Sequence, residues 1–233
     1  MNKNICIVTG VGWGTGNAVV RKFAESGYKV AMIARREDRL AKMASDIEGA
    51  YAYPCDVTDT KSMKSTVEKI CEEIGHPRIV IHNAVGGAWG NFLEIDPAVL
   101  EKNFQVNTMA LLHLARMTLP KMIEYGHGSL ICTGNTSAHR GRAGFAGFAP
   151  SKAAQRILAQ SIARDVGPKG VHVAYITIDA VIDLRWTRKR NPEKSDDFFI
   201  KPDEIADEVY HVAHQPRGAW SFDVEVRPHG EIW

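Results

Sequence analysis

The chain has 233 residues, 45% of them hydrophobic and 24% charged, and its formal net charge is +2. This is the composition of an ordinary soluble protein, and the length suits a single domain over residues 1–233. The small net charge gives no electrostatic reason to expect a nucleic-acid or membrane partner, and no apolar run approaches the roughly 18 residues that span a bilayer.

The four cysteines are scattered along the chain and lack the spacing of metal ligands. Cys6 and Cys132 fall within apolar runs that read as buried strands, Cys55 ends another such run, and Cys71 stands alone. Unclustered cysteines are typical of small apolar side chains in a reducing compartment. The first apolar run begins almost at Met1, so no signal peptide is expected. The sequence therefore predicts a cytoplasmic protein without a metal site.

Strand and helix patterns alternate through the first half of the chain. Short apolar runs, typical of strands buried on both faces, are followed by stretches with helical spacing of apolar residues. The expected strands are residues 5–8, 28–34, 50–55 and 78–82. The expected helices are residues 17–24, residues 37–48, and a third helix that Thr58-Asp59 can cap and that runs to Ile74. Residues 86–90 are expected to form a loop.

The second half continues the alternation. Asp96-Pro97 opens a helical stretch. The expected elements after it are a long helix over about 103–125, a strand at 129–133, a glycine-rich connection at 135–147, a helix at 148–166, a strand at 171–178, a polar irregular segment at 183–200, a last helix starting at 201–203 and a final strand at 223–227. Repeated strand–helix units predict an α/β fold: a doubly wound, Rossmann-type parallel sheet of about seven strands with helices on both faces.

A glycine-rich turn at residues 9–16 follows the first expected strand. Gly10, Gly14 and Gly16 give the pattern Thr-Gly-x-x-x-Gly-x-Gly. Because glycine has no Cβ atom, the backbone can approach a ligand closely, and the free N–H groups at the start of the next helix attract phosphate. Taken alone, the same cluster is also compatible with an ordinary strand-to-helix turn.

Five motifs follow one another over nearly the whole chain: the turn from Thr9 to Gly16, Asp56-Val57 after the third strand, His82-Asn83-Ala84-Val85 after the fourth, Asn107 followed by Leu119-Pro120, and Lys152. In their order and spacing they resemble the motifs of the short-chain dehydrogenase/reductase family. The resemblance implies a nicotinamide cofactor, a carbonyl or alcohol as small-molecule substrate, and a homodimer or homotetramer built through the helices at 103–125 and 148–166. The cofactor contacts that it implies are Gly10, Gly14, Thr15, Gly16, Asp56, Val57, Asn83, Ala84, Lys152 and Ile182.

Arg35 and Arg36 end the second expected strand, where an NAD-selective site usually offers an acid to the ribose. Guanidinium groups suit the 2′-phosphate of NADP, because they bind phosphate through a rigid fork of donors. We therefore expect NADP(H) to be favoured over NAD(H). This preference rests on these two arginines alone, since Trp13 occupies the part of the turn where NADP-selective members often carry another basic residue.

Several positions depart from the active site that the resemblance implies. Asn107 and Lys152 match the asparagine and lysine of the family. Phe148 stands where the family has its proton-donating tyrosine, Asn135 where it has a serine, and Asp179-Ala180 replaces its Pro-Gly. Phenylalanine cannot carry a proton, and positioned acid–base catalysis is worth about 10²–10⁴ in rate. His139, Ser137 and His113 are weak candidates for a substitute donor.

These departures leave two functions open. One is an NADP(H)-dependent oxidoreductase with a non-standard proton donor, and the other is a non-catalytic nucleotide-binding protein or silent subunit. Phe148 favours the second, whereas retained Asn107 and Lys152 favour the enzyme. The segment 183–200 corresponds to the substrate lid of the family, and its basic residues suggest either an anionic substrate or a solvated basic loop. These basic residues are Arg185, Arg188, Lys189 and Arg190.

Overall fold

The computed structural model describes residues 4–231 and contains one sheet of seven parallel strands in the order β3-β2-β1-β4-β5-β6-β9. The strands are β1 (Ile5–Thr9), β2 (Lys29–Ala34), β3 (Ala50–Pro54), β4 (Ile79–His82), β5 (Gly128–Asn135), β6 (Val171–Ile178) and β9 (Asp223–Val226). The order reverses between β1 and β4, which opens a crevice at the carboxyl ends of the strands. The predicted parallel sheet is confirmed.

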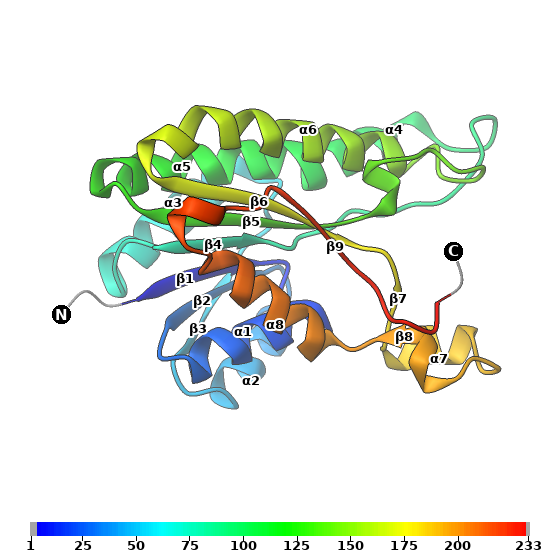
Figure 1. Ribbon diagram of the computed structural model, residues 1–233, viewed down its shortest axis with the longest axis horizontal. Helices are drawn as coiled ribbons and strands as arrows, with labels where there is room; N and C mark the ends of the chain where they lie inside the picture. The colour runs from blue at the N-terminus through cyan, green and yellow to red at the C-terminus, as the bar shows by residue number, and fades with distance from the viewer. Residues whose placement is uncertain (1–3, 232–233) are drawn as a thin grey trace.

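Helices cover both faces of the sheet (Figure 1). One face carries α3 (Thr60–Glu73), α5 (Ala110–Tyr125) and α6 (Ala149–Val166), and the other carries α1 (Thr15–Glu25), α2 (Glu37–Ser45) and α8 (Pro202–Ala213). Because both faces are covered, every residue of β1, β4 and β6 is buried, so these strands are predominantly apolar and lack a regular alternation of polar and apolar residues.

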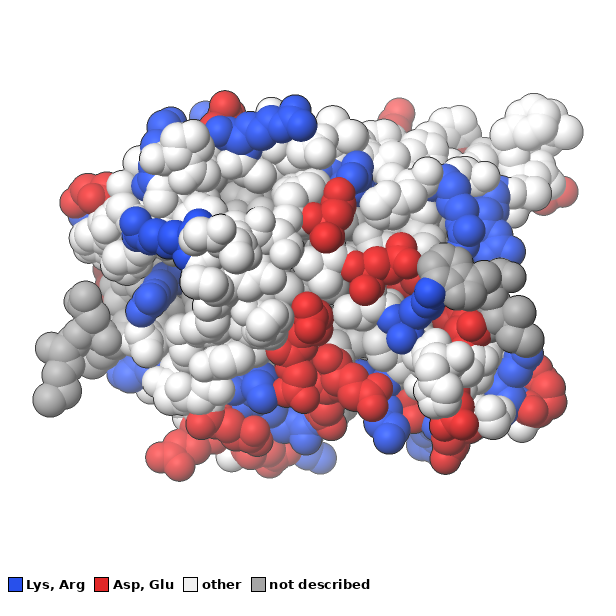
Figure 2. Space-filling model, viewed as in Figure 1, with Lys and Arg blue, Asp and Glu red and all other residues white. Residues whose placement is uncertain are grey.

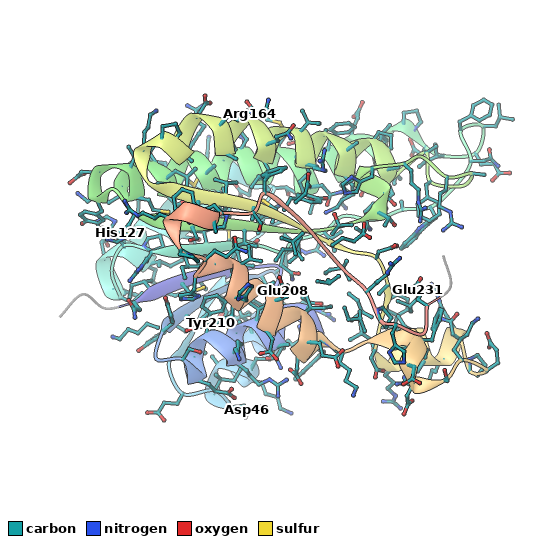
Figure 3. The ribbon with its side chains drawn as sticks, viewed as in Figure 1. Asp46, His127, Arg164, Glu208, Tyr210 and Glu231 are labelled. Carbon is teal, nitrogen blue, oxygen red and sulfur yellow. The ribbon has the colours of Figure 1, made fainter. Side chains whose placement is uncertain are left out.

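Helix α8 lies alongside α1, and the labelled Glu208 and Tyr210 mark its course (Figure 3). The Tyr210 ring meets the Phe23 ring edge-on at 5.1 Å between centroids. Acidic residues at the solvent side of α8 gather over this part of the molecule, while the upper part of the same face is largely uncharged, with scattered basic and acidic groups (Figure 2). Within residues 4–231, no helix combines the length and apolar character that crossing a membrane would require.

The long helix expected from residue 103 begins earlier, because Asp96 caps α4 (Pro97–Phe104) by accepting a hydrogen bond from the Ala98 N–H. A π-helical turn, Gln105–Met109, then joins α4 to α5 without a break. Such turns insert one extra residue and redirect side chains, often at functional sites. This turn carries Asn107.

The segment 183–200 was expected to be irregular, and this prediction is wrong. It contains α7 (Arg185–Arg190), and β8 (Phe199–Ile200) pairs with β7 (Val181–Ile182) in a second, two-stranded sheet. Thr187 caps α7 through hydrogen bonds with the Leu184 backbone. Arg188 forms ion pairs with Asp183 and Asp196. These contacts are made by polar side chains, so they leave no apolar periodicity in the sequence.

Most apolar side chains of the two helices through which the resemblance implies self-association lie inside the protomer. Leu111 and Leu114 of α5 are fully buried, and Leu158 and Ile162 of α6 pack partly buried against the core. Ile157 of α6 is 56% exposed. The homodimer or homotetramer stays a prediction.

Candidate cofactor cleft and catalytic site

A cleft of about 1070 Å³ lies at the carboxyl ends of β1, β2, β3 and β4. The residues that line it come mainly from the loops that leave these strands, so consecutive strand ends contribute to one site. All predicted cofactor contacts except Lys152 line this cleft. These lining residues are Gly10, Gly14, Thr15, Gly16, Arg35, Arg36, Asp56, Val57, Asn83, Ala84 and Ile182.

The glycine-rich turn packs so closely against the end of β4 that Gly10 has no room for a side chain. Gly10 has φ +72°, and a Cβ atom there would lie 2.4 Å from Cα of Ala84. The Asn83 Nδ2 donates a hydrogen bond to the Gly10 carbonyl at 3.0 Å and fixes the turn to the strand end. No side chain caps the first turn of α1, and Gly14, Thr15 and Gly16 at its start line the cleft. Such a cradle fits the pyrophosphate of a dinucleotide.

Gly10→Ala should lower the free energy of unfolding more than Gly27→Ala does. Both glycines have positive φ (72° and 84°), so each variant loses roughly 1–2 kcal/mol of conformational energy. Only Gly10 has neighbours where a Cβ atom would be, since nothing lies within 4 Å of the corresponding position at Gly27. The clash should add about 1–3 kcal/mol. Urea unfolding measures the difference, and equal losses would contradict the packing argument.

Three arginines line the cleft beyond β2. Arg35 and Arg36 are exposed at the strand end, as predicted, and Arg39 joins them from the first turns of α2. Arg39 donates a hydrogen bond to the Val11 carbonyl at 3.1 Å. Burial, and then the charges of Arg36 and Arg35, lower the pKa of Arg39. Sequence reasoning missed Arg39, although its spacing of one helical turn from Arg35 was a usable signal.

Asp56 faces the same part of the cleft with an ionised carboxylate. Burial acts to raise its pKa, but hydrogen bonds from the Thr58 N–H and hydroxyl, together with the charges of Arg35 and Lys102, outweigh that effect and lower it. The cleft thus combines an acceptor group with nearby positive charge. A carboxylate of this kind can accept hydrogen bonds from a nucleotide, and the arginines can bind a phosphate.

Asn107 and Lys152 are buried behind the cleft wall and do not line it. The Asn107 side chain accepts from the Gly86 N–H and donates to the Gly86 carbonyl, both at 2.9 Å, and it donates to Ser151 Oγ at 2.9 Å. The Lys152 ammonium donates to the Thr133 carbonyl at 3.2 Å and to Gln155 Oε1. Burial lowers the pKa of Lys152 to about 8.

Phe148 and Asn135 also lie outside the lining of the cleft. The Phe148 ring is 4% exposed and packs against Trp89 at 5.9 Å between centroids. Asn135 Oδ1 accepts from the Ser137 N–H at 3.2 Å. Among the described residues that line the cleft there is no tyrosine or histidine.

The histidines considered as substitute donors lie elsewhere. His139 shares a hydrogen bond of 2.8 Å with Thr177 Oγ1 and lines a separate hollow between the β5–α6 connection and the loop after β4. His113 lies within α5 and does not line the cleft. The structure therefore brings neither histidine into the cleft.

The segment after β6 closes over the glycine-rich turn. A Cβ atom at Gly14 would lie 2.9 Å from Leu184 Cδ2, so the start of α7 rests directly on the turn. The chain after β9 also reaches this region, where Glu231 lies beside α7 (Figure 3) and Gly230 packs against the Asp197 backbone. Arg188 is occupied by its acidic partners, so it is not a free group for an anionic ligand.

Known proteins resemble this chain over most of its length. The family model for short chain dehydrogenase matches residues 4–193. An uncharacterized oxidoreductase of Staphylococcus aureus strain MRSA252 is 26% identical over 230 residues, 98% of each chain.

Two solved structures share the fold. A metagenomic short-chain oxidoreductase in complex with NADP is 26% identical, with a TM-score of 0.84 over 97% of each chain. An alcohol dehydrogenase of Thermococcus sibiricus, complexed with 5-hydroxy-NADP, is 24% identical, with a TM-score of 0.87 over 99% of each chain. Since the family model spans most of the sequence as well, the chain belongs to the short-chain dehydrogenase family.

Proposed function

We propose that this protein is an NADP(H)-dependent oxidoreductase that acts on a carbonyl or alcohol through a non-standard active site. The observation that carries the proposal is the cleft, in which a close-packed glycine turn adjoins Arg35, Arg36 and Arg39. A phosphate-binding helix start and a group of guanidinium side chains together suit a dinucleotide with a 2′-phosphate. The metagenomic relative at 26% identity, which was solved with NADP, supports this choice.

Each part of the cleft has a task in this proposal. The turn from Gly10 to Gly16 holds the pyrophosphate, Arg35 and Arg36 bind the 2′-phosphate, and Asp56 with Val57 holds the adenine. Asn83, Ala84 and Ile182 also line the cleft, and in this proposal they contact the nicotinamide half. When bound, the reduced nicotinamide supplies a hydride for carbonyl reduction. In this proposal Asn135, the last residue of β5, polarises the substrate carbonyl through its amide N–H group.

A second function is favoured by the surroundings of Phe148. Its ring is buried against Trp89, so this position adds apolar packing and no proton donor. A protein with the same cleft and no effective proton transfer would be a nucleotide-binding protein or a silent subunit.

Binding and turnover measured on the same preparation separate these functions. We expect calorimetry to show NADPH binding and spectrophotometry to show slow NADPH oxidation with simple ketones and aldehydes. Slow turnover follows because a positioned acid contributes about 10²–10⁴ in rate. Binding without turnover on any aldehyde, ketone or alcohol of the panel would favour the second function. Failure to bind NADPH at all would contradict both.

A further inference from the structure

Lys152 is held by a buried polar network that the cleft does not include. Gln155 Oε1 accepts from the Lys152 ammonium, and the same oxygen accepts from the Tyr175 hydroxyl at 3.4 Å. Gln155 Nε2 donates to the Asn107 carbonyl at 2.8 Å. All four side chains are at most 2% exposed. Gln155 therefore links the lysine to β6 on one side and to the π-helical turn on the other.

Tyr175 reaches this network because Gly134 leaves room for it. A Cβ atom at Gly134 would lie 2.1 Å from the Tyr175 hydroxyl oxygen, so the phenol occupies the space beside β5 that a side chain would otherwise fill. The Lys152 nitrogen lies 5.9 Å from the centre of the Tyr175 ring, within the range of a cation–π interaction. A tyrosine from β6 thus contacts the lysine, whereas position 148, just before α6, carries only a phenylalanine ring.

The network continues to the wall of the cleft. Lys152 donates to the Thr133 carbonyl, and the Thr133 hydroxyl donates to Asn83 Oδ1 at 2.9 Å. Asn83 lines the cleft and fixes the glycine turn through its bond to Gly10. A change in the position of the Lys152 ammonium group can therefore act on the cofactor site through Thr133 and Asn83. A change in its protonation can also act on the site through the loss of its positive charge.

We propose that Gln155 and Tyr175 are positioning residues for Lys152, which hold its ammonium group against the inner wall of the cleft and thereby support binding of an anionic dinucleotide. The proposal rests on the proposed function, because it assumes that the cleft receives NADP(H). Gln155 and Tyr175 thus orient Lys152 in a protein that has phenylalanine, and no tyrosine, at position 148.

The titration of Lys152 can be observed separately from that of its neighbours. His82 of β4, Cys132 of β5 and Tyr175 of β6 are the titratable groups that face it. Burial, aided by the Lys152 charge, lowers the pKa of His82 to about 4, and burial raises the pKa of Cys132 to about 12 and that of Tyr175 still further. Between pH 7 and 9.5, Lys152 is therefore the group of this network that changes charge.

Two substitutions at Gln155 should move the Lys152 titration in opposite directions. Gln155→Met removes the acceptor of the charged form and should lower the midpoint, whereas Gln155→Glu places a carboxylate beside the ammonium and should raise it. A side chain with a merely structural role would not produce shifts of opposite sign. Tyr175→Leu should lower the midpoint by removing the aromatic face, and Tyr175→Phe, which keeps that face, should stay close to wild type.

The experiment combines NMR titration of ¹³C-labelled lysine in the cofactor-free protein with NADPH calorimetry from pH 7 to 9.5. The Lys152 signal is assigned from its loss in Lys152→Met. We expect a wild-type midpoint near pH 8 and a weakening of NADPH binding on the order of 3- to 10-fold across it, as one nearby positive charge is lost. In each Gln155 variant the binding profile should shift with the NMR midpoint. The phosphates of NADPH titrate near pH 6, below this window.

Equal midpoints of the Lys152 titration in both Gln155 variants would overturn the proposal. A variant in which this midpoint shifts while the pH profile of NADPH binding stays as in the wild type would also overturn it. Absence of NADPH binding by the wild type would refute the proposed function, and with it the link from the network to the cleft. NADPH binding that is independent of pH, together with the expected slow NADPH oxidation, would leave the proposed function standing and refute only this inference.

Discussion

The double variant Phe148→Tyr, Asn135→Ser is expected to reduce carbonyl substrates at least ~10-fold faster than the wild type, the low side of what acid–base catalysis contributes. The tyrosine introduces a phenol into an apolar contact between α6 and Trp89. The nearby Lys152 charge would favour the phenolate and so ease proton exchange. The serine returns a hydroxyl to the carboxyl end of β5, the edge at which the cleft opens.

NADPH oxidation across pH 5 to 9 on a carbonyl panel measures the effect, with each single variant as a control. His139→Ala is the matched test of the alternative donor, and it should change nothing because that side chain bonds Thr177 outside the cleft. Fast wild-type turnover, undiminished in His139→Ala, would show that the protein needs neither hydroxyl. No gain in the double variant would indicate a pocket no longer shaped for a carbonyl and would favour the binding-protein function.

Replacement of Arg35 and Arg36 by serine should weaken NADPH binding about 10- to 100-fold and leave NADH binding nearly unchanged. Hydrogen bonds to a charged group contribute about 1.5–3 kcal/mol each, and about 1.4 kcal/mol corresponds to tenfold in affinity. The two arginines are exposed, so solvent screening keeps the expected loss below the sum of two such bonds. Arg39 remains nearby and retains part of the positive charge.

Calorimetric titration of both nucleotides checks this result, with Arg116→Ser as the matched control. Arg116 is an exposed arginine of α5 that does not line the cleft, so its loss changes net charge without touching the site. Equal weakening of NADPH and NADH by the double variant would remove the role in selecting the 2′-phosphate. An effect of Arg116→Ser as large as that of the pair would indicate general charge attraction instead.

The sequence by itself determined the sheet and most of the cleft. Strands β1 and β4 are continuous apolar runs because helices bury both of their faces, and such runs can be identified without knowing what covers them. The cleft residues Gly10, Arg35 and Asn83 each follow a strand directly, and Asp56 lies two residues after the end of β3. Parallel strands bring their carboxyl ends to one edge, so a local motif after each strand already defines a shared site.

Only the tertiary structure decided which side chains surround the Lys152 ammonium group. Gln155 meets the Asn107 carbonyl across 48 positions of sequence, and Tyr175 is accommodated by the absence of a side chain at Gly134. The helix α7 depends in the same way on the contacts of Thr187 and Arg188. A polar side chain that bonds a distant backbone group or fills the space left by a glycine has no periodic signature, because its energy depends on geometry that exists only after the sheet and helices have packed.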